Sequence, residues 1–179
     1  MTNKVPFYTH TDYNTSPFKS MEESPNGGWN TPPVLRFEER GRASFQGPRA
    51  TVATAISRTA TVGTPMPLDV WADDDALYST GGNAPLTRAQ PPVELIISKY
   101  RGAGPVTLAE ARPKFETLKG GKALEPYSGK ASAAVTFEQP GEYMLHLNAN
   151  DLSGNGGGGA VCCWTTVIVK VTVSPAATR

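Results

Sequence analysis

The sequence has no excess of charge of either sign and no long apolar run. Its 17 lysine and arginine residues nearly balance 16 aspartate and glutamate residues, which gives a formal net charge of +1. Proteins that bind nucleic acid or anionic membranes usually carry a basic surface patch, so this balance argues against both partners. No apolar stretch approaches the about 20 residues of a membrane-spanning helix. We therefore expect neither a nucleic-acid partner nor a membrane span.

Cysteine and histidine are scarce, with two residues of each. His10, His146, Cys162 and Cys163 match none of the familiar spacings of zinc ligands, so a zinc site is not expected. A redox-active pair more often has the Cys-x-x-Cys spacing, whereas Cys162 and Cys163 are adjacent. Neighbouring residues of a strand point to opposite faces, so we favour one buried and one exposed thiol. A disulfide between the two is the alternative, and it requires a local distortion of the backbone.

Catalytic motifs and a signal-peptide core are also missing. The chain has no Gly-x-Ser-x-Gly motif and no pair of His and Asp in a recognisable nucleophile context. The glycine-rich run 154–159 lies between two predicted strands, whereas a phosphate-binding loop precedes a helix. Residues 1–13 are polar and are interrupted by Pro6, unlike a signal peptide. We do not expect an enzyme, and export as a mature chain or by another route stays open.

Two strand patterns flank the glycine-rich run. Apolar side chains recur at every second position in residues 143–149, and valine alternates with other residues in the β-branched run 166–173. β-branched residues favour strands over helices. Together these patterns predict the last hairpin of a β-sandwich. Residues 93–100 form the longest apolar run before it and predict a central strand, and residues 131–137 predict another.

Two stretches resemble a known family. The run TATVGTPMPLDVWADDDA, residues 59–76, resembles the opening of polycystin-repeat (PKD-type) and related immunoglobulin-like domains. The run FEQPGEYMLHLNANDLSG, residues 137–154, is similar to the end of the same domains and of domains in uncharacterised bacterial proteins. The middle departs from the family, because residues 93–100 stand where a Trp and a Gly-Asp-Gly segment are usual. The resemblance implies an all-β, immunoglobulin-like (PKD-like) β-sandwich.

The N-terminal part of the chain has a different character. Residues 1–49 contain six prolines and no helical pattern, so we expect an extended arm, followed by the sandwich over residues 50–179. Residues 5–13 alternate like a strand, and a lone strand is not stable in water. Aromatic residues are unusual in so irregular a segment, which suggests burial against a surface. The residues predicted to make the arm adhesive are Val5, Phe7, Tyr8, Tyr13, Phe18 and Trp29.

Two acidic groups are candidate calcium ligands. The first is Asp73, Asp74 and Asp75, and the second is Asn150 with Asp151. In an immunoglobulin-like sandwich the loops after the second and sixth strands lie at the same end, where the two groups would converge. Calcium takes six to eight oxygen ligands from carboxylates, amides and carbonyl groups. The alternative is that these are ordinary loop residues, because Asp and Asn are common in turns.

These features predict a structural protein without catalytic activity. We expect an extracellular or cell-surface subunit whose arm pairs with a neighbouring copy by strand addition. Head-to-tail contacts close only where the rotation permits a ring, so the expected product is a homopolymer such as a filament. The alternative is a calcium-dependent accessory module that binds carbohydrate or protein. Asn14 begins the sequon Asn14-Thr15-Ser16 and is a candidate glycosylation site.

Overall fold

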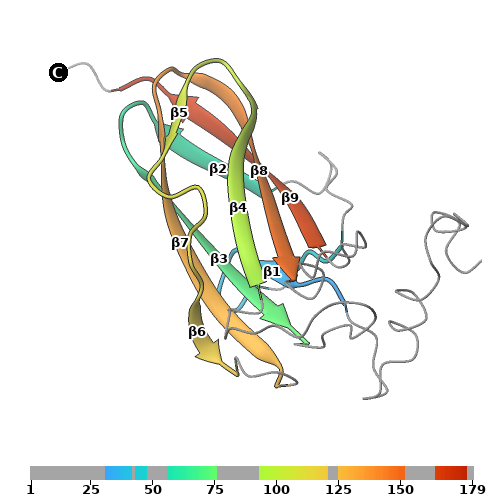
Figure 1. Cartoon of the computed structure of the whole chain (residues 1–179). Coiled ribbons are helices and arrows are strands. Elements are labelled where there is room, and N and C mark those ends of the chain that lie inside the picture. The colour runs from blue at the N-terminus through green and yellow to red at the C-terminus, as the bar shows by residue number, and fades with distance from the viewer. Residues whose placement is uncertain are drawn as a thin grey trace, which may run out of the picture.

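The computed structural model of the chain describes residues 31–41, 43–47, 56–75, 93–120, 125–151 and 164–176. All regular structure in these ranges is β-strand, and the strands form two sheets packed face to face (Figure 1). The described ranges thus contain no helix that is long and apolar enough to cross a membrane. The predicted all-β class is confirmed.

The first sheet has the strand order β1-β3-β7-β5, with β6 also paired to β7, and the second has the order β2-β9-β8-β4. All neighbouring strands are antiparallel except β2 and β9, which are parallel. The strands are β1 (Val34–Arg36), β2 (Ile56–Thr61), β3 (Met66–Asp74), β4 (Val93–Gly102), β5 (Val106–Leu108), β6 (Glu116–Lys119), β7 (Tyr127–Phe137), β8 (Gly141–Asp151) and β9 (Trp164–Ser174).

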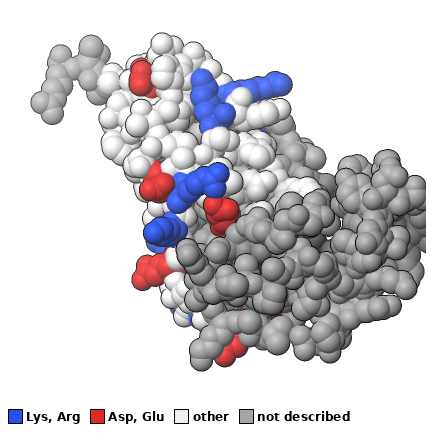
Figure 2. All heavy atoms as spheres, in the orientation of Figure 1, with Lys and Arg blue, Asp and Glu red and all other residues white. Residues whose placement is uncertain are grey.

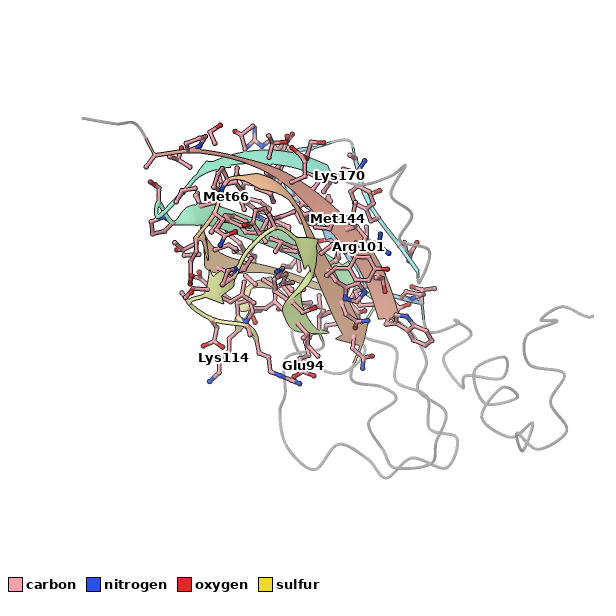
Figure 3. The ribbon with its side chains drawn as sticks, turned by 90° about the horizontal axis from the view of Figure 1, so that it is seen from above. Met66, Glu94, Arg101, Lys114, Met144 and Lys170 are labelled. Carbon is pink, nitrogen blue, oxygen red and sulfur yellow. The ribbon has the colours of Figure 1, made fainter. Side chains whose placement is uncertain are left out.

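The alternating patterns place one face of each long strand in the core. In β8, Tyr143, Leu145 and Leu147 are at most 1% exposed, and the residues between them are only half-buried. β9 pairs antiparallel with β8 over its whole length, as the predicted last hairpin requires. Side chains of both sheets, including Met66 of β3, fill the space between the two layers (Figure 3).

The strand order is that of an immunoglobulin-like sandwich. Such sandwiches place their first, second, fifth and fourth strands in one sheet and their third, sixth and seventh in the other. The first set corresponds to β1, β3, β7 and the pair of short strands β5 and β6. The second set corresponds to β4, β8 and β9. The Tyr143 hydroxyl, near the start of β8, also donates a hydrogen bond to the Gln139 carbonyl in the preceding turn. This is the tyrosine corner of immunoglobulin-like domains, but nothing in the strand order distinguishes a PKD-type repeat.

The sandwich begins earlier in the chain than residue 50, where the sequence analysis placed its start. β1 pairs antiparallel with β3, Leu35 is fully buried, and Phe37 is 7% exposed. The Phe37 ring packs edge to face against Phe45 at 5.9 Å. The three residues of β1 follow Pro32-Pro33 and are too few to show an alternating pattern, so sequence reasoning assigned them to the arm.

Two crossing segments close the sides of the sandwich. On one side, the Ala109 amide bonds to Ala134 of β7, while the Ala111 carbonyl accepts a bond from Ile97 of β4. On the other side, the backbone of Leu35 exchanges two hydrogen bonds with Phe45, and residue 47 bonds to β9. Each segment therefore passes from one sheet to the other and covers the edge of the core.

Candidate functional site

The acidic residues Asp73 and Asp74 do not lie in a loop, because β3 continues through Asp74. The two neighbours point to opposite faces: Asp74 is 7% exposed, whereas Asp73 forms an ion pair with Arg36 at 2.6 Å. Asp75 accepts hydrogen bonds from the amide and the hydroxyl of Thr31, at 2.9 and 2.7 Å. The sandwich itself therefore engages these carboxylates.

The ends of β3 and β8 lie at the same end of the sandwich, as the fold predicts (Figure 1). Asn150 pairs with Glu94 of β4 and Trp164 of β9, while the Asp151 side chain lies outside the described residues. Within the described ranges, no three His, Cys, Asp or Glu side chains form a group that would hold a metal ion. Calcium binding stays a prediction, and calorimetry together with the melting temperature in chelator tests it.

A pocket of about 290 Å³ opens beside the aspartates. It is close to the lower limit of the about 300–1,000 Å³ that is usual for ligand sites. Tyr127 in its wall is 2% exposed; burial raises the pKa of its hydroxyl, and the charge of Asp74 acts in the same direction. Three carboxylates and one ammonium among the lining side chains give the pocket a negative net charge. Its lining residues are Thr31, Pro32, Val34, Asp73, Asp74, Asp75, Lys119, Pro126, Tyr127 and Ser128.

A network of polar side chains crosses the outer face of the five-stranded sheet. Asp69 accepts a hydrogen bond of 2.6 Å from Ser132 and an ion-pair contact of 2.9 Å from Lys130. The bond from Ser132, followed by that from Lys130, lowers the pKa of Asp69. The Lys130 ammonium lies 5.0 Å from the centre of the Trp71 ring. Trp71 is thus half-buried beneath a cation.

The outer face of the four-stranded sheet carries an exposed aromatic residue that sequence reasoning missed. Tyr100 is 55% exposed, with Arg101 at 5.3 Å from its ring centre and the His146 ring at 6.4 Å. Figure 3 shows Arg101, Met144 and Lys170 side by side across β4, β8 and β9. The only sequence signal was that Tyr100 ends an apolar run next to charged residues.

Charges of both signs are interspersed on the face seen in Figure 2.

The second feature that sequence reasoning missed is the outward edge of β2. The Val62 amide donates a hydrogen bond of 3.0 Å to Ser174 of β9. Backbone groups of alternate residues in a strand point to the same side, so Ile56, Arg58 and Ala60 also face β9. The N–H and C=O groups of Ser57 and Thr59 therefore point away from the sheet, and no backbone group of the described residues bonds to them. The Ser57 carbonyl accepts a hydrogen bond of 3.0 Å from the Arg58 guanidinium.

The other predicted site residues lie outside the described ranges. These are the arm residues Val5, Phe7, Tyr8, Tyr13, Phe18 and Trp29, the candidate glycosylation site Asn14, and the pair Cys162 and Cys163. The assignments made for them from the sequence therefore stay predictions.

No protein-family model matches the chain, and no curated protein matches it in sequence. Solved structures that are similar to it include the following three. Domains 4 and 5 of the S-layer protein SbsC match with 11% identity and a TM-score of 0.33, over 66% of this chain and 47% of that one. PbICP-C in complex with falcipain-2 matches with 14% identity and a TM-score of 0.37, over 67% and 88%. The ASH/PapD-like domain 7 of human CEP192 matches with 11% identity and a TM-score of 0.36, over 84% and 89%.

The chain thus spans about half of the S-layer structure that it matches. Similarities this weak identify neither a family nor a function, so the functional interpretation rests on the geometry of the sandwich and on the sequence of the arm.

Proposed function

We propose that the chain is a non-catalytic structural subunit of an extracellular or cell-surface assembly, in which the arm of one copy pairs with the sandwich of the next. The observation that supports this proposal best is the outward edge of β2. A row of unpaired backbone N–H and C=O groups is a template for an additional strand. β2 has the sequence ISRTAT, which contains no proline or lysine; its one charged residue, Arg58, uses its guanidinium to bond the Ser57 and Phe37 carbonyls.

The other sheet edges are closed or short within the described ranges. β1 is covered by the bridge between Leu35 and Phe45. β4 bonds through Ile97 to Ala111, and its register shifts between residues 99 and 101. The free edge of β7 is covered at one end by β5 and at the other by the four-residue β6, which itself contains a register shift. β2 therefore offers the longest regular receiving edge.

The arm has the composition and the reach of a donor strand. Residues 5–13 alternate and are rich in aromatic and β-branched residues, which favour strands. Thirty residues precede Thr31, and a fully extended segment of that length spans about 100 Å. This length is sufficient to reach a neighbouring copy of the chain.

Deleting residues 1–30 tests the proposal. The core residues in the described ranges lie between Leu35 and Val173, so the shortened chain retains all of them. Circular dichroism with a thermal melt checks that it folds. Light scattering and negative-stain imaging should show large oligomers or fibres for the full chain and monomers after the deletion. Assembly that survives the deletion unchanged contradicts the proposal.

A second candidate function is carbohydrate or protein binding, and the exposed Tyr100 is the observation that favours it. Aromatic rings on a sheet face offer a platform for an apolar sugar surface, and Tyr100 is flanked by Arg101 and His146. A glycan array tests this alternative. Tyr100→Ala should lose binding, whereas the control Leu118→Ala, which replaces another 55% exposed residue, should retain it. If the full chain binds no glycan, the carbohydrate-binding alternative is contradicted.

A further inference from the structure

We infer that the arm adds to β2 as a parallel strand, with the backbones of its odd-numbered residues facing β2 and their side chains facing the core. This inference rests on the proposed function and deepens it, because it names the receiving edge, the direction of the donor and the donor residues that pair. The odd-numbered residues of the donor strand are Val5, Phe7, Thr9, Thr11 and Tyr13.

The first step is the geometry of the receiving edge. The backbone groups of Ser57 and Thr59 point away from β9 at the open edge, and their exposed side chains point away from the core. On either side of them, Ile56 and Ala60 are half-buried and pack against the core. Arg58 lies between them with its side chain on the same inner side, where its guanidinium donates a hydrogen bond to the Phe37 carbonyl. The outward edge of β2 therefore has a polar outer face and an inner face that is apolar at Ile56 and Ala60, with Arg58 between them.

The second step is the position of Pro6 in the donor. Proline has no N–H, so in a sheet it is placed where its backbone faces away from the neighbouring strand. Residues 8, 10 and 12 have the same parity as Pro6, and their backbones then face away as well. The odd-numbered residues must consequently form the hydrogen bonds with β2.

The third step is the distribution of apolar side chains in the donor. Val5, Phe7 and Tyr13 belong to the odd-numbered set, whereas the even-numbered set combines Tyr8 with the polar residues His10 and Asp12. Burial favours the apolar set on the core side of the sheet. The residues that bond to β2 are thus also the residues whose side chains should point inward.

Only parallel addition satisfies both requirements. In an antiparallel pair, residues that bond to each other stand directly opposite, and their side chains share one face. Antiparallel pairing to Ser57 and Thr59 would place the odd-numbered side chains on the solvent face. In a parallel pair, a residue bonds to the neighbours of the residue opposite it, as Val62 does when it donates to Ser174. The odd-numbered side chains then join Ile56, Arg58 and Ala60 on the inner face.

The surface beside this edge suits such side chains. Phe45, Ile56, Ala60 and Val62 are partly buried apolar residues that pack against the core. Val5 and Phe7 would extend this apolar surface by one strand. The added strand would then present Pro6 on the new edge, where a further strand would find no donor at that position. Each edge should accept a single arm, which yields a linear chain of copies.

A pair of proline substitutions in the full chain tests whether the odd-numbered donor residues, and not the even-numbered ones, bond to β2. Thr9→Pro removes an amide that faces β2, whereas His10→Pro removes an amide that faces away, and neither lies in the described sandwich. Light scattering should show monomers for Thr9→Pro and assembly like that of the unmodified chain for His10→Pro. Equal effects, or a larger effect at His10, overturn the inference.

A substitution on β2 tests the receiving edge. Thr59→Pro removes an outward amide and keeps the bonds to β9, while Thr59→Val keeps the amide and serves as the control. We expect monomers for Thr59→Pro and assembly for Thr59→Val, with melting temperatures that confirm folding. If Thr59→Pro assembles while the chain without residues 1–30 does not, β2 is not the receiving edge and only this inference fails. If the shortened chain also assembles, the proposed function fails.

Mixing two variants distinguishes pairing between copies from pairing within one copy. Thr9→Pro keeps an open edge but has no competent donor, and Thr59→Pro keeps the donor but has no open edge. An equimolar mixture should therefore form a heterodimer and stop there. A mixture that stays monomeric overturns pairing between copies.

Disulfide formation between engineered cysteines tests the direction of the donor in a chain whose two native cysteines are replaced by serine. A donor cysteine at Thr9 or Thr11 is combined with an acceptor cysteine at Ile56 or Ala60. In a parallel pair, moving the donor from Thr9→Cys to Thr11→Cys shifts the preferred partner toward Ala60. A shift toward Ile56 shows antiparallel pairing and overturns the stated direction.

Discussion

The Tyr143 hydroxyl donates a hydrogen bond of 2.8 Å to the carbonyl oxygen of Gln139, in the turn between β7 and β8. The same hydroxyl oxygen accepts a bond of 3.0 Å from the Gly104 amide, in the turn between β4 and β5. The Tyr143 ring packs against Phe137 at 4.8 Å and covers Gly102. One buried side chain thus joins two turns at the same end of the sandwich.

Tyr143→Phe should destabilise the sandwich, because it leaves the Gln139 carbonyl and the Gly104 amide without this partner. A buried polar group that loses its hydrogen bond costs about 1–3 kcal/mol. Urea unfolding should show a lower midpoint with an unchanged slope. Tyr100→Phe is the matched control, because Tyr100 is 55% exposed, and it should leave the midpoint unchanged. Equal midpoints for the two variants contradict the role assigned to Tyr143.

Gly129→Ala should destabilise the chain through a steric conflict with Tyr127. A Cβ atom at position 129 would lie 2.1 Å from the Tyr127 hydroxyl oxygen and 2.7 Å from the ring carbon that bears it. Forcing extra volume into a packed core typically costs about 1–3 kcal/mol. In a Tyr127→Phe background the nearest atom is gone, so the cost of Gly129→Ala should be smaller. An identical cost in both backgrounds, measured by urea unfolding, shows that the ring is not the cause.

The contribution of Asp69 to stability should depend on pH. The hydrogen bond from Ser132, followed by that from Lys130, lowers the pKa of Asp69 below its ordinary value of 3.8. A carboxyl whose pKa is lowered on folding stabilises the fold above its unfolded pKa, and this stabilisation is lost as the pH falls through the folded value. The difference in unfolding free energy between the unmodified chain and Asp69→Asn should therefore be constant above about pH 5 and shrink in acid.

The size of this effect is limited by solvent. The Asp69 side chain is 38% exposed, so screening should keep its contribution to about 1 kcal/mol or less. Glu142→Gln changes an exposed carboxyl away from this network and is the control. A difference for Asp69→Asn that grows toward low pH contradicts the assigned hydrogen bonds.

Strands with a long alternating pattern or a long apolar run were predictable from the sequence, because such residues become buried in the core. β4, β8 and β9 are the clear examples, and the immunoglobulin-like fold follows from their arrangement. β1, β5 and β6 were not predicted, since three or four residues are too few to show a period and pairing with β3 or β7 decides their conformation.

The candidate sites were less predictable than the fold. Asp73 and Asp74 have the composition of a loop, but pairing with Ser128 and Tyr127 of β7 extends β3 through them. The bonding role of the Tyr143 hydroxyl and the open edge of β2 depend on which strands are neighbours. That information is not present in local periodicity, whereas the parity of the donor strand around Pro6 can be read from the sequence alone.

The most direct test of assembly through the arm is the mass of the full chain in solution, measured by light scattering over a wide range of protein concentration. The account predicts a mass that rises with concentration well above the 19.0 kDa of one chain. A mass that stays at that of a single chain at every concentration contradicts it and shows that the arm does not join one copy to another.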